Sequence, residues 1–474
     1  MTKILLTGAN GYIGRNLLEN LSHGNYEIYC TVRDKNRFSF IEKENIKIIE
    51  LDFLDKSTLY RIPNDIDIAY YLMHSMSSSH KNFINLESEV ANNFVEYIET
   101  TKVKQVIYLT GMLNEEKLST HLESRQKVEQ ILSKGKFNLT TLRAGIIIGA
   151  GSASFEIIRD LVEKLPIMVA PKWIKTKCQP ISVIDVIKIL TSIILKEGTY
   201  NQAYDISGEE ILTYKQMLLE YAKYRKLKRL IISVPVLTPK LSSYWLYFVT
   251  SVPFALARSL VDSMSIDFIA RNNYLVDLLD IKPLNYHESI ASAFDKIKQN
   301  TVISRWTNAI SNGKLDSNIE KYIKIPVKGC LIDKRSEFIK NREDVLNTLW
   351  CIGGQNGWLY ANILWKFRGF IDKLVGGVGL NRYRRNARII ENGDVIDFWR
   401  VILANKEKGI LILYAEMKLP GEAWLEFIVR NDKIYQKACF RPRGLSGRLY
   451  WYLLLPFHTL IFRGMLKQIV KKSE

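Results

Sequence analysis

Cysteine and histidine are scarce in this chain of 474 residues. The cysteines lie far apart and form no C-x-x-C pair: Cys30, Cys178, Cys330, Cys351 and Cys439. The six histidines are equally scattered. An odd and dispersed set of thiols excludes the disulfide framework of a small secreted domain, and the spacing shows no zinc-ligand cluster. We therefore expect reduced cysteines, a cytoplasmic protein and no bound metal.

Long hydrophobic runs are also lacking. The longest, residues 244–257 and 449–462, have about 14 residues each and contain proline, whereas a membrane-spanning helix needs about 20 apolar residues. The N-terminal "MTKILLTGANGYIG" loses its apolar character at Thr7, so we do not interpret it as a signal peptide. We expect both runs to form buried helices. Shallow membrane contact, including contact by the basic and aromatic C-terminal helix, is the alternative.

Acidic residues are outnumbered, with 49 Asp and Glu against 67 Lys and Arg, which gives a net charge of +18. The basic residues are spread along the chain, and neither an aromatic-interleaved RNA signature nor a helix-turn-helix pattern is present. We therefore expect a solvated basic surface and no nucleic-acid partner. A small hydrophobic substrate or ligand remains the expected partner, and the oligomeric state is left open.

Strands and helices alternate regularly in the first part of the chain. Apolar runs of strand length occur at 3–6, 27–32, 46–51, 67–72, 104–109 and 139–142. Amphipathic helices fit between them, for instance at 14–22, 86–101 and 120–133, and another follows at 181–194. This alternation predicts an α/β fold with a doubly wound parallel sheet.

The pattern changes beyond residue 300. A helical region at 345–374 precedes alternating segments at 394–403, 409–419, 423–430 and 433–442, and a helix closes the chain at 446–472. The short turns between the segments indicate consecutive antiparallel strands. We predict an N-terminal domain over 1–300, a linker over 301–324 and an α+β domain over 325–474.

A glycine-rich loop follows the first strand in "ILLTGANGYIGRNLLENL". Gly8 permits a tight turn, Gly11 lets the backbone approach a pyrophosphate, and Gly14 lets the following helix pack against the strand. The helix N-terminus offers N–H groups to the phosphates. Glycine turns also occur without a ligand, but the strand before this loop and the helix after it favour a dinucleotide site. We expect the loop to contact the cofactor through Gly8, Asn10, Gly11, Tyr12, Ile13 and Gly14.

The ends of the next strands indicate which cofactor is bound. Arg33 follows the second strand where an acidic residue would favour NAD, and an arginine there suits the 2′-phosphate of NADP(H). Asp34 keeps NAD as an alternative. Asp52 and Phe53 could flank the adenine, although Asp52 could equally be a helix cap. His74 should lie near the nicotinamide, as a substrate contact or a structural histidine.

The T-G-x-x-G-x-x-G loop, "LDFLD" and "QPISVIDV" resemble the extended and atypical short-chain dehydrogenase/reductases. In active extended members a helix begins Y-x-x-x-K, and "HLESRQKVEQIL" is in the same frame with His121 at the tyrosine and Arg125 at the lysine. "AEMKLPGEAWLEF" and "PRGLSGRLYWYLLLPFH" resemble an atypical group in which this domain is fused to an uncharacterised C-terminal domain. The resemblance implies an NAD(P)-binding Rossmann domain followed by a helix-grip (SRPBCC/START-type) fold.

Two functions are compatible with these residues. In the first, the chain is an oxidoreductase acting on a hydrophobic carbonyl or quinone-like substrate, with His121 as proton donor, Arg125 on the cofactor and Thr110 on the substrate carbonyl. Histidine can donate a proton, whereas arginine stays charged and can only bind. In the second, the chain is a non-catalytic NADP(H)-binding sensor or scaffold with a ligand-binding C-terminal domain.

Two further features have alternative interpretations. The small residues of "GAGSASF" at 149–155 would permit close approach of the nicotinamide and the substrate, or form a plain helix-entry turn. The C-terminal tryptophans would line an apolar cavity, or simply be core residues. They are Trp358, Trp365, Trp399, Trp424 and Trp451.

Overall fold

A computed structural model describes the protein. The described residues are 1–35, 38, 43–73, 83–112, 120–234, 239–250, 252, 254–264, 266–271, 274–299, 301–306, 325–326, 329–380 and 384–473. The chain divides into two compact units. The first comprises Met1–Lys35 and Phe40–Gly313, and the second is formed mainly by Lys314–Glu474. We call them the N-terminal unit and the C-terminal unit.

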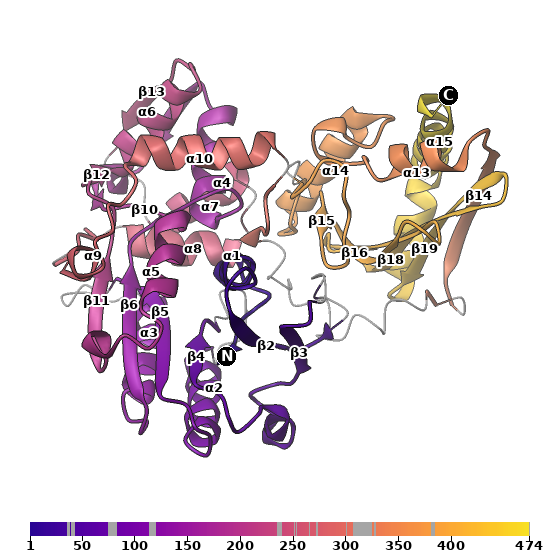
Figure 1. The fold of residues 1–474 in the computed structure, drawn as a ribbon. Helices are drawn as coiled ribbons and strands as arrows, with labels where there is room; N and C mark the ends of the chain where they lie inside the picture. Colours follow the sequence, from indigo (N-terminus) through magenta and orange to yellow (C-terminus); the bar gives the residue numbers. More distant parts are fainter. Residues whose placement is uncertain are drawn as a thin grey trace. The chain divides into compact units, whose positions relative to one another are not determined.

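The N-terminal unit is built on a seven-stranded sheet with the order β11-β6-β5-β4-β1-β2-β3 (Figure 1). Its strands are β1 (Thr2–Leu6), β2 (Tyr26–Val32), β3 (Ile46–Glu50), β4 (Ile68–Tyr71), β5 (Gln105–Gly111), β6 (Asn138–Ala144) and β11 (Gln202–Ile206). All neighbours in the sheet pair in parallel. The predicted α/β class and the six predicted strands are confirmed.

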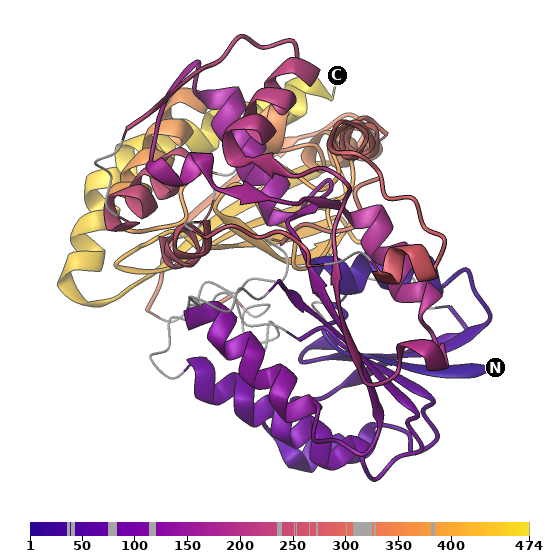
Figure 2. The ribbon, with the colours of Figure 1, turned by 90° about the vertical axis from the view of Figure 1, so that its left-hand side faces the viewer.

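Helices cover both faces of this sheet. Helices α2 (Phe83–Ile98) and α3 (Thr120–Leu132) lie side by side on one face, as Figure 2 shows in purple. Their apolar residues form one core with alternate strand residues such as Leu5, Ala69 and Val106. Helices α1 (Tyr12–Leu21) and α5 (Val183–Ser192) contact each other on the other face, where the hydroxyl of Tyr70 donates to the Leu190 carbonyl at 2.8 Å. The sheet is therefore doubly wound.

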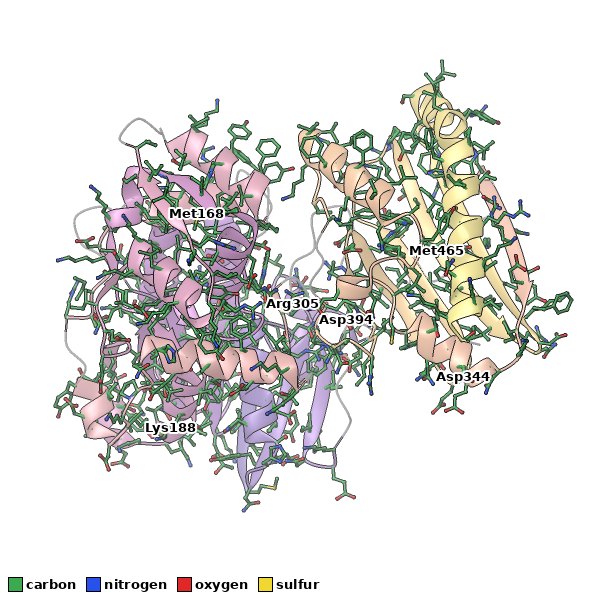
Figure 3. The ribbon with its side chains drawn as sticks, turned by 90° about the horizontal axis from the view of Figure 1, so that it is seen from above. Met168, Lys188, Arg305, Asp344, Asp394 and Met465 are labelled. Atoms are coloured by element: carbon green, nitrogen blue, oxygen red, sulfur yellow. The ribbon has the colours of Figure 1, made fainter. Side chains whose placement is uncertain are left out.

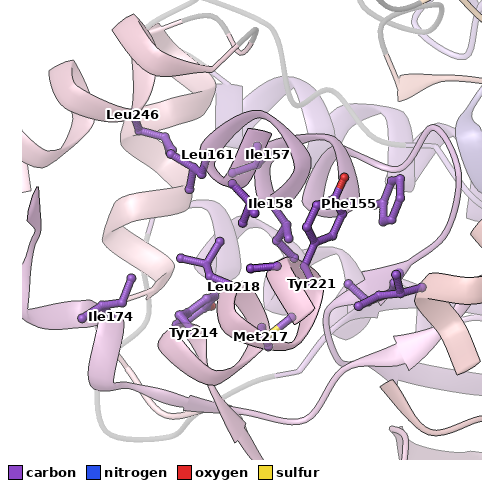
Figure 4. Close-up of a cluster of buried hydrophobic side chains, with 14 of the residues drawn as sticks. Phe155, Ile157, Ile158, Leu161, Ile174, Tyr214, Met217, Leu218, Tyr221 and Leu246 are labelled. Atoms are coloured by element: carbon purple, nitrogen blue, oxygen red, sulfur yellow. The ribbon is translucent and has the colours of Figure 1, made fainter. Parts of the chain in front are cut away.

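A second core lies beyond the sheet, around helices α4 (Ala153–Lys164), α6 (Tyr214–Tyr224) and α10 (Tyr286–Lys298). Figure 4 shows its apolar side chains, among them Phe155 and Tyr221. Helices α7 (Pro239–Val249), α8 (Phe254–Met264) and α9 (Tyr274–Leu278) complete this part. The short strands pair as β7 (Ile147–Ile148) with β10 (Ile181–Ser182), β8 (Ile167–Ala170) with β13 (Leu230–Ser233), and β9 (Lys177–Cys178) with β12 (Leu212–Thr213).

The C-terminal unit is an antiparallel sheet with the order β14-β19-β18-β17-β16-β15. Its strands are β14 (Leu331–Phe338), β15 (Val395–Ile396), β16 (Trp399–Asn405), β17 (Ile410–Ala415), β18 (Gly421–Arg430) and β19 (Lys433–Pro442). Its helices are α13 (Arg342–Leu349), α14 (Asn362–Leu374) and α15 (Gly444–Lys472). The four predicted segments are strands, although the first is broken at Asp397, whose φ is 54°. Strand β14 was not predicted, and the helical region at 345–374 is two helices.

The two apolar runs behave differently. Residues 244–257 fall in α7 and α8, and several, including Leu246 and Ala257, are buried. The prediction that residues 449–462 form a buried helix is wrong for most of that run, because Leu449, Tyr452, Leu453 and Phe457 are each more than half exposed. Among the described residues, α15 alone is long and apolar enough to cross a membrane by length and composition.

The tryptophans of the C-terminal unit are core residues. The five that were singled out are buried, as is Trp350, and Trp358 stacks on Trp365 with ring centroids 4.8 Å apart. The indole N–H of Trp358 donates to the Asp397 carboxylate at 2.6 Å. The interpretation of these side chains as core is therefore confirmed, while the helix-grip resemblance stays a prediction.

Candidate functional site

The loop between β1 and α1 adopts the backbone that its glycines predict. Gly8 has a φ of +67°, and a Cβ on it would lie 2.5 Å from the Leu72 carbonyl oxygen. A Cβ on Gly14 would lie 2.3 Å from the Gly8 carbonyl oxygen. Gly8 therefore makes the tight turn, and Gly14 lets α1 pack against it, as predicted.

The N-terminus of α1 is left open. Gly11 is its N-cap, no side chain caps it, and its first turn contains no acidic residue. In contrast, α4, α5, α6 and α10 all begin with a side-chain cap. Among the described residues, a Cβ on Gly11 would meet only the Gly8 carbonyl oxygen, at 3.1 Å. An uncapped helix N-terminus offers its first backbone N–H groups, here those of Tyr12, Ile13 and Gly14, to a phosphate.

The loop lies at the point where the strand order reverses. Strand β1 stands between β2 and β4, and the helices that follow β1 and β4 cover opposite faces of the sheet. The Thr7 hydroxyl donates to the Tyr70 carbonyl at 2.8 Å and accepts the Leu72 N–H at 3.3 Å, which ties the ends of β1 and β4 together. In open α/β sheets, ligands bind in the crevice at such a switch point.

The Tyr12 side chain points into the protein. A Cβ on Gly149 would lie 2.6 Å from the Tyr12 hydroxyl oxygen. Burial raises the pKa of the Tyr12 hydroxyl, and the neighbouring Glu156 raises it further. Tyr12 can therefore offer a cofactor its backbone N–H rather than its phenol.

The small residues that follow β6 allow other parts of the N-terminal unit, rather than a ligand, to pack closely on this segment. A Cβ on Gly149 would clash with Val183, and a Cβ on Gly151 would lie 2.2 Å from the Ser304 carbonyl oxygen. The N–H of Trp306 donates to the Gly151 carbonyl at 2.9 Å. These contacts support the helix-entry interpretation of this segment. They also show that residues 301–306 pack on the N-terminal unit, so the predicted linker begins too early.

Two arginines lie near the end of β2. Arg33 is exposed and makes no ion pair with the described residues. Arg15 follows Gly14 in α1 and lies close enough to Cys30 of β2 to influence it: burial raises the pKa of the Cys30 thiol to about 12, and Arg15 opposes that rise. Sequence reasoning missed Arg15, although an arginine directly after the last glycine of the loop was a visible signal.

Asp52 and Phe53 are engaged locally. The Asp52 carboxylate accepts the Leu54 N–H at 3.0 Å in a local turn, while the short helix that follows is capped by Asp55 and not by Asp52. The Phe53 ring is buried and packs 5.7 Å from the Phe94 ring, in the core beneath α2. The Phe53 carbonyl accepts the Asn93 side-chain N–H at 2.8 Å, so an adenine contact by Phe53, which stays a prediction, would not use its ring in this position.

Three polar atoms are buried around the switch point without a hydrogen-bond partner among the described residues. They are Asn10 Oδ1 in the loop, Thr110 Oγ1 near the end of β5 and Arg125 Nε in α3. Arg125 lies within electrostatic reach of Tyr71 at the end of β4. Buried polar atoms are normally paired, so these three are the groups near the loop with spare hydrogen-bonding capacity among the described residues. Elsewhere in the described chain, no group of His, Cys, Asp or Glu could hold a metal.

An ion pair fixes α3 to the sheet. Arg143 of β6 binds Glu129 of α3 through two contacts, Nη2 to Oε1 at 2.6 Å and Nε to Oε2 at 3.3 Å. Since α3 also carries Arg125 and, in its first turn, His121, the pair sets where these residues can lie.

Two predicted site residues cannot be placed. His74 lies outside the described residues, as do the rest of 74–82 and 113–119. His121 belongs to α3, but its side chain is likewise outside the described part.

Two family models match parts of the chain. Residues 4–112 match the NAD dependent epimerase/dehydratase family, and residues 331–465 match a family described as a protein of unknown function, DUF2867. Among curated proteins, a photosystem II assembly factor, Ycf39 of Cyanophora paradoxa, is 24% identical over 213 residues. That match covers 43% of this chain and 63% of the relative, which is less than two thirds of its length.

Solved structures share the fold of the N-terminal unit. An NADPH-dependent quinone oxidoreductase of Escherichia coli, complexed with NADPH, matches with a TM-score of 0.51 and 18% identity, over 61% of this chain and 99% of its own. The epimerase Mth375 of Methanothermobacter thermautotrophicus matches with a TM-score of 0.50 and 13% identity, over 63% and 93%. These likenesses show a Rossmann-like fold.

Proposed function

We propose that the N-terminal unit binds NADP(H) and that the chain uses it to reduce a hydrophobic carbonyl or quinone-like molecule. The open N-terminus of α1 carries the cofactor assignment. Its N–H groups are uncapped, Gly11 leaves room above them, and the turn sits at the switch point of the sheet. The exposed guanidinium of Arg33 favours a 2′-phosphate over a plain ribose.

The catalytic part of the proposal assigns three roles. Bound NADPH supplies a hydride. Thr110 Oγ1, which is buried and unpaired among the described residues, would donate a hydrogen bond to the substrate carbonyl. Arg125 would hold ribose hydroxyls or phosphate, since it stays charged and cannot pass a proton. His121, one helical turn before Arg125, would donate the proton to the carbonyl oxygen.

NADPH oxidation by the full chain, followed at 340 nm against a panel of quinones and aldehydes, tests this assignment. The wild type should turn over at least one substrate, and His121→Phe should lose most of that turnover while keeping NADPH affinity. Thr110→Val should lower kcat with little change in stability. Turnover that survives His121→Phe would remove His121 as the acid.

The second candidate is a non-catalytic NADP(H)-binding sensor or scaffold. The exchange of Tyr and Lys for His121 and Arg125 favours it, as does the name of the curated relative, an assembly factor. Three indole N–H groups of the C-terminal unit keep spare hydrogen-bonding capacity, although their rings belong to the core. Those of Trp365, Trp399 and Trp424 have no hydrogen-bond partner among the described residues.

Binding and turnover separate the two candidates. Tight NADPH binding with no turnover on any substrate would support the sensor. Native mass spectrometry of the full chain would then show whether a small molecule co-purifies. Trp399→Phe, which removes one orphaned N–H and keeps the ring packing, should weaken retention of that molecule. A chain that binds no dinucleotide would contradict both candidates.

A further inference from the structure

Two helices of the C-terminal unit present apolar side chains to the outside. On α14 the exposed residues are Ile363, Phe367, Phe370, Ile371 and Leu374. On α15 they are Leu445, Leu449, Tyr452, Leu453, Phe457 and Leu460. The positions recur every three or four residues, so each set forms one stripe along its helix. The stripe on α15 alone is about 22 Å long.

The opposite sides of both helices are buried. On α14 the buried residues include Trp365 and Asp372, and on α15 they include Trp451, Phe462 and Met465, the last labelled in Figure 3. Both helices are therefore anchored in the core by one side and expose apolar residues on the other. Large contiguous exposed apolar surface is rare in soluble domains and marks an interaction site.

Side chains of the two helices meet in the core. Trp365, early in α14, contacts Phe462 in the second half of α15, with ring centroids 6.4 Å apart. Arg368, further along α14, hydrogen bonds to Tyr450 in the first half of α15. Each helix turns its buried side to the core and its stripe away from it, and we call the two stripes together the two-helix face.

Basic residues flank the two-helix face. Lys366 of α14 and Arg448 of α15 are exposed next to the apolar stripes. Along α15 the outward positions after Leu460 are Arg463, Lys467 and Lys471, all exposed. Neither helix exposes an acidic residue, since α15 contains none and Asp372 of α14 is fully buried.

We propose that the two-helix face is a peripheral membrane-binding surface that recognises anionic lipid. The apolar stripes would enter the boundary between headgroups and acyl chains, and the basic rim would bind the headgroups. Phe367, Phe370, Tyr452 and Phe457 supply the aromatic side chains that favour this boundary. A second copy of this chain is a poorer occupant, because it would bring the same basic residues against each other.

The charge and burial pattern also decide the mode of contact. Helix α15 lies on the membrane and does not cross it. Crossing would pull Phe462, Met465, Leu466 and Ile469 out of the core of the C-terminal unit, where each is at most 7% exposed. The inference does not depend on the proposed reaction, although a membrane surface would suit a hydrophobic substrate.

Co-sedimentation of the full chain with vesicles tests the proposal. We compare vesicles of phosphatidylcholine with vesicles of equal parts phosphatidylcholine and phosphatidylglycerol, at low and high salt. The wild type should bind the anionic vesicles about tenfold or more tightly than the neutral ones, and salt should weaken this binding. Absence of binding to anionic vesicles at low salt, or equal binding to both compositions, would overturn the proposal.

Variants locate the contact. The triple variant Leu449→Glu, Leu453→Glu, Phe457→Glu should weaken vesicle binding about tenfold or more, with an unchanged thermal midpoint because these side chains are exposed. The matched control is Tyr60→Glu, Ile167→Glu, Leu230→Glu, which changes three equally exposed apolar residues of the N-terminal unit and should bind as the wild type. Unchanged binding by the first triple variant would contradict the proposal. A second outcome would also contradict the proposal: the wild type does not bind vesicles, sediments as a dimer, and becomes a monomer in the first triple variant. The two-helix face would then join two copies of the chain.

Discussion

A Cβ on Gly14 would stand 2.3 Å from the carbonyl oxygen of Gly8, whereas a Cβ on Gly11 would meet that same oxygen at 3.1 Å and no other atom of the described residues. The two glycines are thus required for different reasons. Gly14 is needed for the protein to fold this way, because a backbone oxygen cannot move aside. Gly11 is needed only if something else must approach the loop.

Alanine at each position should separate folding from binding. Gly14→Ala should lower the free energy of unfolding by about 1–3 kcal/mol, as overpacking against backbone does. Gly11→Ala should cost under about 1 kcal/mol but abolish detectable NADPH binding, because its methyl group would occupy the phosphate space. Urea denaturation and calorimetric NADPH titration measure the two effects. Gly198→Ala, with open space around its Cβ, is the control. Full NADPH affinity in Gly11→Ala would rule out a pyrophosphate in this loop.

Arg33 should decide between the two dinucleotides. Arg33→Ser removes an exposed guanidinium at the end of β2, so NADPH affinity should fall about tenfold while NADH affinity stays nearly constant. Lys134→Ser changes another exposed cation, beyond the C-terminal end of α3, and should alter neither affinity. An equal loss for both dinucleotides would show that Arg33 does not read the 2′-phosphate.

Replacing one member of the buried ion pair of the C-terminal unit should lower the free energy of unfolding strongly, whereas replacing both should lower it much less. Arg400 Nε lies 2.9 Å from Glu416 Oε1, and both side chains are at most 3% exposed. Arg400→Met leaves the Glu416 charge buried, so we expect a loss of about 3–5 kcal/mol. The double variant Arg400→Met, Glu416→Met should recover most of it, which a double-mutant cycle in urea measures. Additive losses would mean that the two residues do not act as a pair.

The stability of the C-terminal unit should fall in mild acid. Burial lowers the pKa of His458 to about 4, and its ring lies between those of Trp451 and Phe462. Between these pKa values the His458 imidazole is protonated in the unfolded chain and neutral in the folded chain. The free energy of unfolding is therefore highest above the unfolded pKa of about 6.5 and declines as the pH falls toward 4. We expect roughly 2–3 kcal/mol less stability near pH 4.5 than at pH 7.5, followed by tryptophan fluorescence.

Replacing the ring isolates this effect. His458→Phe should flatten the pH dependence between these values, while His23→Gln, at an exposed site, should leave it unchanged. A wild-type stability that does not vary with pH in this window would contradict the role given to His458.

Much of the N-terminal unit was visible in the sequence because its signals are local. Each parallel strand is an apolar run followed by an amphipathic helix, and the glycine loop needs its own φ values whatever surrounds it. Strand β14 gave no such signal. Its residues alternate between intermediate and exposed, and it becomes a strand by pairing with β19, about a hundred residues later in the chain. Pairing over that distance has no local signature.

The amino-acid sequence by itself determined the strand–helix alternation, the glycine turn and the position of the uncapped helix, since each follows from residues within one turn or strand. Only the tertiary structure decided that Phe53 belongs to the core, that Gly149 and Gly151 accommodate Tyr12 and Ser304, and that the apolar run at 449–462 is largely exposed. The physical reason is that burial depends on which distant surface meets a side chain. The local sequence around an apolar residue does not show whether that residue will pack on a sheet, contact lipid or face water.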